Sequence, residues 1–342
     1  MKILIPIIRG NSGSDVYFQC LRDALHKRNI AITLTRLPQY LELAPPVAKI
    51  ALFWKGDARN YDLVHTNGDH GSHFKVRGRP LILTVLHNVF EENYQRYTTT
   101  FQKLYHHVFL KRYLYRALNT ADKIVAISLS TKTSLERTFG ISNVALIYGG
   151  VDTDTFRPKE VGTTDEFAGK VRLLFVGNLT RRKGADLLPK IMEKLGRNYV
   201  LFYTSGLRKK GILTGPNMVS LGSITREKLV DMYNVCDILV LPSRLEGFGY
   251  AVAEAMACGK PIVCTNGSSL PELVVEGRGG FLCEQDNIED FVEKIRILGK
   301  DEKLRQAMGQ FNRQRILENF TVTKMAENYL SFYRSTMETI SS

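Results

Sequence analysis

Apolar runs of strand length alternate with helical patterns along the first half of the chain. The runs predict strands at 2–8, 31–37, 61–67, 81–90, 122–130 and 144–152. Helical segments separate most of these strands, beginning with residues 16–28. Strands that alternate with helices in this way form a mainly parallel sheet with helices packed against it.

The alternation restarts after a polar, irregular stretch that contains Pro158, Gly162 and Gly169. The second half is predicted to hold strands at 171–178, 198–205, 217–223, 237–243 and 260–266, and helices at 184–196, 225–236, 249–259 and over most of 287–320. The pattern therefore predicts an α/β protein of two facing, doubly wound, Rossmann-like domains with a ligand cleft between them. We expect an N-terminal domain at 1–158, a linker at 159–170, a C-terminal domain at 171–322, and a final helix at 323–342 that packs back on the first domain.

Length and composition are those of an ordinary globular protein of about two domains. The chain of 342 residues carries 47 Lys and Arg against 34 Asp and Glu, a net charge of +13. This excess suits a polyanion, an anionic membrane or a phosphorylated ligand, and does not choose among them. Five cysteines without a C-x-x-C pair indicate buried thiols in a reducing cytosol rather than zinc or disulfides. The N-terminal apolar run reads as a strand and no run is long enough to span a membrane, so we predict a cytoplasmic protein.

The stretch 246–254, "EGFGYAVAE", places two acids around a glycine turn that leads from a predicted strand into a predicted helix. Free N–H groups at a helix N-terminus favour an anion, which the carboxylates of Glu246 and Glu254 would oppose. The conflict disappears if the two carboxylates accept hydrogen bonds from hydroxyl groups on either side of a phosphate. A nucleotide-sugar has that shape. The alternative is that both acids lie on the solvated surface.

A cationic loop follows the predicted strand at 171–178. Arg181, Arg182 and Lys183 lie between glycines in "GNLTRRKG", just before a predicted helix. Their position at the carboxyl end of a strand suits a diphosphate, while a solvated basic turn is the alternative interpretation.

Residues 241–274 resemble the donor-site signature of glycosyltransferase family 4, which comprises retaining enzymes of the GT-B fold. The E-x7-E spacing, the EGFG turn and the A-x-G-x-P continuation all match. Further matching segments occur in order at 121–128, 150–158, 176–184 and 229–243, together with the glycine loop after the first strand.

The resemblance implies a role for each matching residue of the donor site. Glu246 would hold donor-sugar hydroxyls, Glu254 the ribose hydroxyls, and Lys183 would neutralise the diphosphate. Asn178 stands where the family usually has Arg, and Arg181 or Arg182 would substitute for it. The residues implied to bind the donor are Gly13, Arg182, Lys183, Gly222, Ser223, Glu246, Gly247, Phe248, Gly249 and Glu254.

In the first domain, the resemblance implies that His87 contacts the donor sugar. His87, Lys183 and Glu246 would then form the catalytic set. The alternative is that His87 is a structural His at a strand end.

The His- and Asp-rich loop at 65–73 fits no zinc spacing, and we interpret Asn67, Asp69 and His70 as acceptor-side residues. "DTD" at 152–154 imitates a metal-binding motif but matches the family's interdomain segment. We therefore predict neither a metal nor a cofactor.

Together with these residues, the resemblance implies a metal-independent, retaining hexosyltransferase. It would move a hexosyl or N-acetylhexosaminyl group from a nucleotide-diphosphate sugar to a hydroxyl of a glycan or lipid-linked acceptor, in cell-envelope glycan or polysaccharide synthesis. UDP-sugars are favoured and GDP-mannose stays open. The segment 94–118 interleaves aromatics with cations and predicts reversible contact with an anionic membrane through Tyr105, Phe109, Tyr113 and Leu114. The alternative is a helix that packs its aromatics into its own domain.

Three other classes of protein compete with this prediction. A sugar-nucleotide epimerase of the same fold should lack the pair of glutamates. A dinucleotide-binding oxidoreductase needs the motif G-x-G-x-x-G, but here Val252 stands at the position of the third glycine. A basic nucleic-acid-binding protein is the non-enzyme alternative, although no recognised DNA or RNA motif occurs and we predict no nucleic-acid partner.

Overall fold

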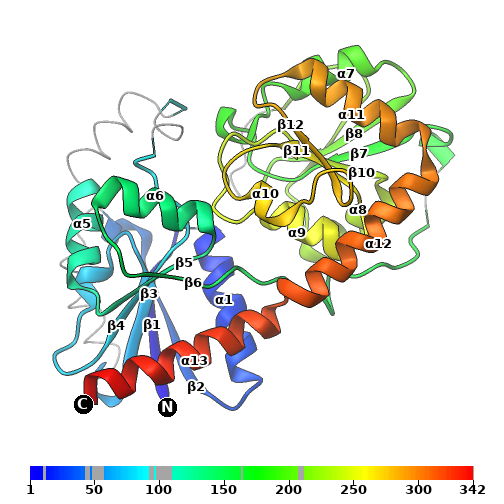
Figure 1. Ribbon diagram of the computed structural model, residues 1–342. Helices are drawn as coiled ribbons and strands as arrows, with labels where there is room; N and C mark the ends of the chain where they lie inside the picture. Colours follow the sequence, from blue (N-terminus) through cyan, green and yellow to red (C-terminus); the bar gives the residue numbers. More distant parts are fainter. Residues whose placement is uncertain are drawn as a thin grey trace. The chain divides into compact units, whose positions relative to one another are not determined.

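The computed structural model divides into two compact units, which are described separately (Figure 1). Unit 1 comprises Met1–Gly150 and Val322–Ser342, and unit 2 comprises Val151–Thr321. The structure describes residues 1–10, 13–42, 47, 58–91, 96–97, 110–162, 165–206 and 212–341. The expected linker at 159–170 thus falls within unit 2, and the division of the chain lies at residue 150 rather than 158.

Unit 1 is built on a six-stranded parallel sheet with the strand order β2-β1-β3-β4-β5-β6. The strands are β1 Lys2–Ile8, β2 Ala31–Leu37, β3 Leu63–Asn67, β4 Leu81–Val85, β5 Lys123–Ala126 and β6 Val144–Leu146. Six consecutive residues of β1 are buried. Continuous burial of this kind is typical of a parallel strand that is covered on both faces.

The described helices of unit 1 begin and end at recognisable signals. They are α1 Gly13–His26, α5 Lys111–Thr120, α6 Leu129–Phe139 and α13 Val322–Ser341, with 3-10 turns at Gln39–Glu42, Ala58–Asn60 and Gly71–Phe74 (η3). For example, the Ser128 side chain accepts from the backbone N–H of Thr131 at the start of α6, and Gly140 ends that helix in the left-handed conformation.

The C-terminal helix α13 belongs to unit 1, where it packs against α1 (Figure 1). A buried polar chain joins it to the sheet. Tyr329 lies 2.6 Å from the Tyr17 hydroxyl and 2.7 Å from the Thr84 hydroxyl, while His65 lies between Thr84 and Tyr333, 2.7 Å from each. Burial lowers the pKa of His65 to about 3, so its ring is neutral at physiological pH.

Unit 2 repeats the architecture with the strand order β12-β11-β10-β7-β8-β9, again parallel throughout. The strands are β7 Val171–Phe175, β8 Tyr199–Thr204, β9 Met218–Gly222, β10 Ile238–Leu241, β11 Ile262–Thr265 and β12 Gly280–Cys283. The helices are α7 Leu188–Leu195, α8 Arg226–Val235, α9 Tyr250–Ala257, α10 Leu270–Leu273, α11 Ile288–Lys300 and α12 Glu302–Asn319, with 3-10 turns at Asp165–Phe167 and Arg181–Lys183 (η6). Helix α9 packs against α12, and α7 packs against α11.

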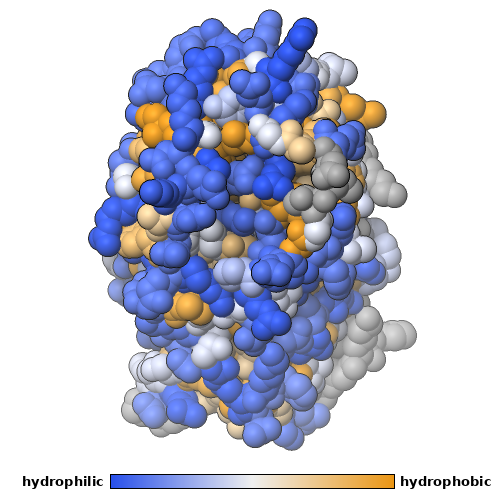
Figure 2. Space-filling model, turned by 90° about the vertical axis from the view of Figure 1, so that its right-hand side faces the viewer, coloured by the Kyte–Doolittle hydropathy of each residue, from blue (hydrophilic) through white to orange (hydrophobic). Residues whose placement is uncertain are grey.

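The α/β class and the two parallel sheets confirm the predicted fold class. Two elements of unit 2 were not predicted, namely β12 and α10. The predicted strands in unit 1 that continue past residues 85, 126 and 146 end earlier in the structure. On the face shown in Figure 2, apolar residues lie in small separate groups within a mostly hydrophilic surface.

Candidate active site

The strand order of unit 2 reverses direction between two adjacent strands, β7 and β10. In a doubly wound sheet, the loops that leave such strands at their carboxyl ends diverge and form a crevice for ligands. The loop after β7 contains η6 (Arg181–Lys183), and the loop after β10 contains Glu246. The structure therefore brings the two stretches that the sequence singled out to the same point of one sheet.

Close backbone packing joins these two loops. Gly184 has a φ of +70°, and a Cβ atom there would lie 1.9 Å from the carbonyl oxygen of Pro242. The Arg182 side chain donates to the Leu245 carbonyl over 2.7 Å, and the Arg244 backbone N–H donates to the Arg182 carbonyl over 2.9 Å. Only glycine at position 184 allows this approach.

The Arg244 side chain holds three loops of unit 2 together. Its side chain is only 4% exposed, and it makes two hydrogen bonds to Asp186, of 2.7 and 2.9 Å. Its Nε atom donates to Asp286 over 2.6 Å. Because a guanidinium binds carboxylates in a fixed planar geometry, Arg244 sets the loop before α7 and the loop before α11 relative to the loop after β10.

Lys183 and Glu246 form an ion pair at the centre of the joined loops. Lys183 Nζ lies 2.5 Å from Glu246 Oε1, and the side chains are 16% and 7% exposed. Burial by itself would raise the pKa of Glu246, but Lys183 and Arg182 outweigh it and lower that pKa. Burial lowers the pKa of Lys183, and Glu246 opposes that effect. Glu246 is thus not the solvated surface acid of the alternative interpretation.

The pairing of Lys183 with Glu246 was not predicted, because the sequence assigned each residue to a different part of a ligand. They are 63 positions apart in sequence, and no local pattern signals that they touch. Glu246 is held in place through its backbone. Its N–H donates to the Ser268 hydroxyl over 2.9 Å, and its carbonyl accepts from the Ser269 hydroxyl over 3.2 Å.

The glycine turn after Glu246 leads into α9, as predicted. Gly249 has a φ of +93°, which strongly favours glycine, and Tyr250 begins the helix. The Phe248 side chain is buried against Tyr250 and Phe320. Its side chain is thus in the core of unit 2, and only its backbone remains for a ligand.

Glu254 lies on α9 and is half-buried. The Tyr233 hydroxyl donates to Glu254 Oε2 over 2.8 Å. Burial raises the pKa of Glu254 to about 7, although Tyr233 and the charge of Arg226 oppose the increase. Tyr233 was not among the predicted site residues.

The remaining predicted donor residues of unit 2 lie at nearby strand ends. Gly222 ends β9 with a φ of +64° and has open space where a Cβ atom would be, and Ser223 after it is exposed. Asn178 packs against Gly206, where a Cβ atom would lie 2.2 Å from the Asn178 Oδ1 atom. Arg181 is largely exposed.

In unit 1 the strand order reverses between β1 and β3. Gly13 is the exposed first residue of α1, which follows β1, and Asn67 ends β3. His70 is buried against the ring of Tyr113, and burial lowers the pKa of His70 to about 4. Asp69 beside it is half-buried.

His87 is exposed just after β4. The next residue, Asn88, is buried and bonds this loop to α6: its amide donates to the Ser134 hydroxyl over 3.0 Å and to the Thr138 hydroxyl over 2.8 Å. Its Oδ1 atom accepts from the Phe90 N–H over 3.0 Å. Asn88 therefore fixes the backbone that carries His87, a role that its sequence neighbourhood did not reveal.

The expected membrane contact at 94–118 needs correction. Tyr105 and Phe109 lie outside the described residues. Leu114 is 1% exposed and belongs to the core of unit 1, so it does not dip into a membrane interface. Tyr113 packs edge-on against His70 and His73. Of the four side chains expected at the membrane, the two that the structure describes thus pack into unit 1, and contact through the cations of this segment stays a prediction.

Asp152, the first acid of the "DTD" stretch, closes a turn. It accepts from the Thr155 hydroxyl over 2.7 Å and pairs with Arg226 over 3.2 Å. Within the described ranges, no group of three or more His, Cys, Asp or Glu side chains could hold a metal ion. None of the helices described here is long and apolar enough to cross a membrane.

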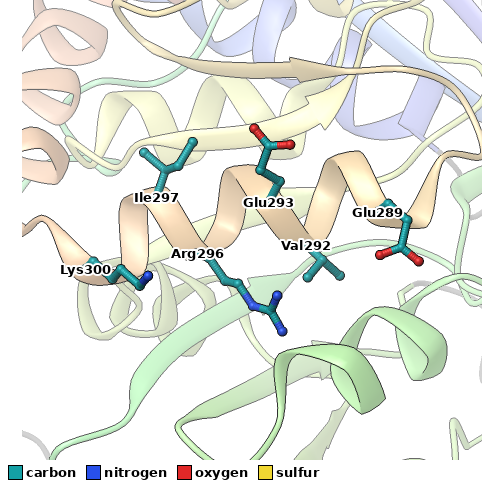
Figure 3. Close-up of a pocket in the computed structure, with 6 residues that line it drawn as sticks. All are labelled: Glu289, Val292, Glu293, Arg296, Ile297 and Lys300. Atoms are coloured by element: carbon teal, nitrogen blue, oxygen red, sulfur yellow. The ribbon is translucent and has the colours of Figure 1, made fainter.

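A shallow hollow of about 400 Å³ lies along α11 (Figure 3). Its lining residues are Glu289, Val292, Glu293, Arg296, Ile297 and Lys300. All six come from one helix and none is a predicted site residue, so the hollow is separate from the joined loops after β7 and β10.

Both halves of the chain match models of glycosyltransferase families. Residues 157–315 match the model described as Glycosyl transferases group 1, and residues 12–155 match the model described as Glycosyltransferase Family 4. An uncharacterized glycosyltransferase of Methanocaldococcus jannaschii is 32% identical over 206 residues, which cover 58% of this chain and 56% of the relative. The chain spans about half the length of the curated relatives that it matches.

Solved structures share the fold over almost the whole chain. Sucrose-phosphate synthase from Thermosynechococcus elongatus has a TM-score of 0.84 at 18% identity, and the match covers 99% of this chain and 100% of that one. HepE from Anabaena, solved in complex with UDP and glucose, has a TM-score of 0.77 at 18% identity and covers 98% and 100%. The chain has the GT-B fold and belongs to the family 4 glycosyltransferases, with the group 1 model matching its second unit.

Proposed function

We propose that this protein is a retaining glycosyltransferase that moves a hexosyl or N-acetylhexosaminyl group from a nucleotide-diphosphate sugar to a hydroxyl of a glycan or lipid-linked acceptor. The observation that carries the proposal is the shielded Lys183–Glu246 pair at the strand-order reversal of unit 2. One cation and one hydrogen-bond acceptor, fixed side by side, match the junction between a diphosphate and a sugar.

The donor would lie along the loops that follow β7 and β10. Lys183 and Arg182 supply positive charge for the diphosphate, and the N–H groups that open α9 add to it. Glu246 accepts from hydroxyls of the sugar, and Glu254 from hydroxyls of the ribose. Gly222 and Ser223 are assigned to the base, and the donor roles that the resemblance implies for His87 and Gly13 of unit 1 stay predictions.

The reaction would break the bond between the anomeric carbon and the diphosphate oxygen. The leaving diphosphate gains negative charge as that bond breaks, and Lys183, Arg182 and the α9 N-terminus stabilise it without a divalent ion. The acceptor oxygen forms its bond to the anomeric carbon on the face from which the diphosphate leaves. Attack on that face retains the configuration. The acceptor proton passes to a phosphate oxygen, so no protein base is required.

A UDP-sugar is the favoured donor, because the similar HepE structures were solved with UDP and with UDP-glucose. Asn67, Asp69 and His70 are proposed to face the acceptor at the strand-order reversal of unit 1. The exposed cations on α5, Lys111, Arg112 and Arg116, support reversible contact with an anionic membrane surface. Equal sedimentation with neutral and anionic liposomes would argue against that contact.

Thermal unfolding in the presence of UDP, GDP, ADP and their sugar conjugates tests the donor. A ligand at a hundredfold excess over Kd stabilises a site by about 2.7 kcal/mol, so the correct nucleotide should raise Tm clearly. Slow hydrolysis of the matching sugar conjugate would confirm the chemistry, and proton NMR of the product reports its anomeric configuration. A product of inverted configuration, or no stabilisation by any nucleotide, would overturn the proposal.

Glu246→Ala separates the two halves of the donor. It should weaken use of the sugar conjugate much more than binding of the free nucleotide, because Glu246 is assigned to the sugar. Equal losses for both ligands would contradict that assignment.

A further inference from the structure

The hydroxyl of Tyr233 is hydrogen-bonded to one of the two carboxylate oxygens of Glu254. Tyr233 lies near the C-terminal end of α8 and is fully buried. Its hydroxyl donates to Oε2 over 2.8 Å, so Oε1 remains as the acceptor that can serve a ligand.

The ring of Tyr233 is held by an aromatic and ionic stack. The Phe156 ring lies edge-on to it, with 5.9 Å between the ring centroids. The Arg226 guanidinium lies over the Phe156 ring, 5.2 Å from the centroid of that ring. Arg226 also pairs with Asp152 over 3.2 Å. With its ring packed in this way, the Tyr233 hydroxyl has a defined position against Glu254.

Other ionisable groups surround this side of α9. They are Arg226 on α8, Cys236 after α8, Cys258 and Lys260 after α9, and Arg313 on α12. Burial raises the pKa of Cys236 and Cys258 to about 12, so these thiols are neutral near pH 7. Burial likewise raises the pKa of Tyr233 well above its ordinary value. Tyr233 therefore remains a donor across the whole working range.

A donor that cannot ionise stabilises the charged form of its partner. Of the groups around Glu254, Tyr233 and Arg226 are the two that oppose the increase of its pKa by burial. Arg226 is about half exposed and is screened by water and salt, whereas Tyr233 acts through a direct, partly buried hydrogen bond of 2.8 Å.

We propose that Tyr233 is the positioning residue of the nucleotide site, which orients Glu254 through Oε2 and favours its ionised form, so that Oε1 accepts from the ribose hydroxyls of a nucleoside diphosphate. This proposal rests on the proposed function, in which Glu254 binds the ribose. It adds to the site a residue of α8, a helix that contributes none of the other proposed donor residues, and it predicts a pH dependence that follows Tyr233.

The test is the variant Tyr233→Phe in the full chain, with calorimetric binding of UDP, GDP or ADP, whichever stabilises the wild type most. Kd is measured from pH 5.5 to 9.5. Wild-type binding should weaken as the pH falls through about 7, where Glu254 becomes protonated. In Tyr233→Phe the midpoint should rise by about one to two pH units, because a hydrogen bond to a charged group is lost. At pH 7 the variant should therefore bind about 5- to 50-fold more weakly, and it should recover at high pH.

Two variants provide the controls. Glu254→Gln reports the pH dependence that comes from the nucleotide phosphates, whose last proton is lost at about pH 6, and adding Tyr233→Phe to Glu254→Gln should not move the midpoint further. Tyr203→Phe makes the same chemical change at another buried tyrosine of unit 2, whose hydroxyl bonds the backbone of Leu213. Its midpoint should equal that of the wild type.

The outcomes separate the two proposals. If no nucleotide binds the wild type, the proposed function fails and Tyr233 has no site to position. If the wild type binds with a midpoint near 7 and Tyr233→Phe keeps that midpoint, the role of Tyr233 is overturned while the proposed function stands. If Tyr233→Phe does not fold, 3-fluorotyrosine at position 233 keeps the ring and makes the hydroxyl a stronger hydrogen-bond donor. A lower midpoint than in the wild type supports the proposal, and an unchanged midpoint overturns it.

Discussion

The Lys183–Glu246 pair offers the most direct test of how the loops of unit 2 are held. The perturbation is a double-mutant cycle of Lys183→Met, Glu246→Gln and the two together. Each single change removes one charge and leaves the other in a site where the two side chains are only 16% and 7% exposed. The double variant removes both.

The expected magnitude follows from distance and burial. At 2.5 Å and an effective dielectric constant of about 20, two unit charges attract by roughly 7 kcal/mol. Loss of water costs several kcal/mol for each ion, which offsets most of that attraction. Removing one partner of a buried pair costs about 3–5 kcal/mol because the other charge stays behind. Since Lys183 keeps some contact with water, we expect about 2–4 kcal/mol for each single variant and a coupling energy of about 2 kcal/mol.

Denaturant and thermal unfolding of the full chain measure the cycle. For a unit of this size, 1 kcal/mol shifts Tm by about 2–4 °C, so each single variant should unfold about 5–15 °C lower. Lys194 and Glu289 provide a matched control pair. Their atoms are also 2.5 Å apart, but the side chains are 48% and 71% exposed, and Figure 3 shows Glu289 on α11.

Exposed ion pairs typically couple by about 0.2–1 kcal/mol. If Lys183–Glu246 couples no more strongly than Lys194–Glu289, the site pair is not shielded, and the reasoning from burial is wrong. The double variant could instead lose as much free energy of unfolding as the two single variants together. In that case the losses come from packing rather than from charge.

Three further predictions concern other residues. Gly184→Ala should destabilise unit 2 and abolish nucleotide binding, because its Cβ atom would lie 1.9 Å from the Pro242 carbonyl oxygen; an unchanged Tm would contradict that close approach. The pKa of His65 is lowered from 6.5 to about 3, so the unfolded state binds the proton first, and the free energy of unfolding should fall by up to about 4–5 kcal/mol between pH 6.5 and 3. His65→Gln should flatten that dependence in urea titrations. Asn88→Ala should lower kcat by roughly 10- to 100-fold with little change in donor binding, and a normal kcat would exclude a role in holding His87.

Much of the fold could be predicted because buried parallel strands are continuous apolar runs. The predicted strand at 2–8 coincides with Lys2–Ile8, in which six residues are buried. The edge strand Ala31–Leu37 also matches its prediction at 31–37, but there only Leu37 is buried and the signal was the alternation of apolar and polar residues. The unpredicted elements, Gly280–Cys283 and Leu270–Leu273, are four residues long. Four residues are too few to show a helical or strand period of apolar positions. In Gly280–Cys283, the glycine at the start weakens the strand signal further.

Helix boundaries depended on local signals that the hydrophobic period does not contain. The predicted helical stretch at 287–320 is two helices, because the Asp301 side chain accepts from the Leu304 N–H over 2.8 Å and starts α12. The Asp is a recognised N-cap residue. A search for caps within the stretch would have found the break.

The sequence by itself determined the class of fold, the position of the glycine turn at 246–249, and the residue types of the proposed donor site. These are local properties, because strand period, turn chemistry and motif spacing are all read within a few residues. Only the tertiary structure decided which side chains meet. Lys183 pairs with Glu246, Arg244 with Asp186 and Asp286, and Tyr233 with Glu254. Each of these contacts joins loops or helices far apart in sequence, and their meeting depends on strand order and on close packing at glycines, which no local pattern encodes.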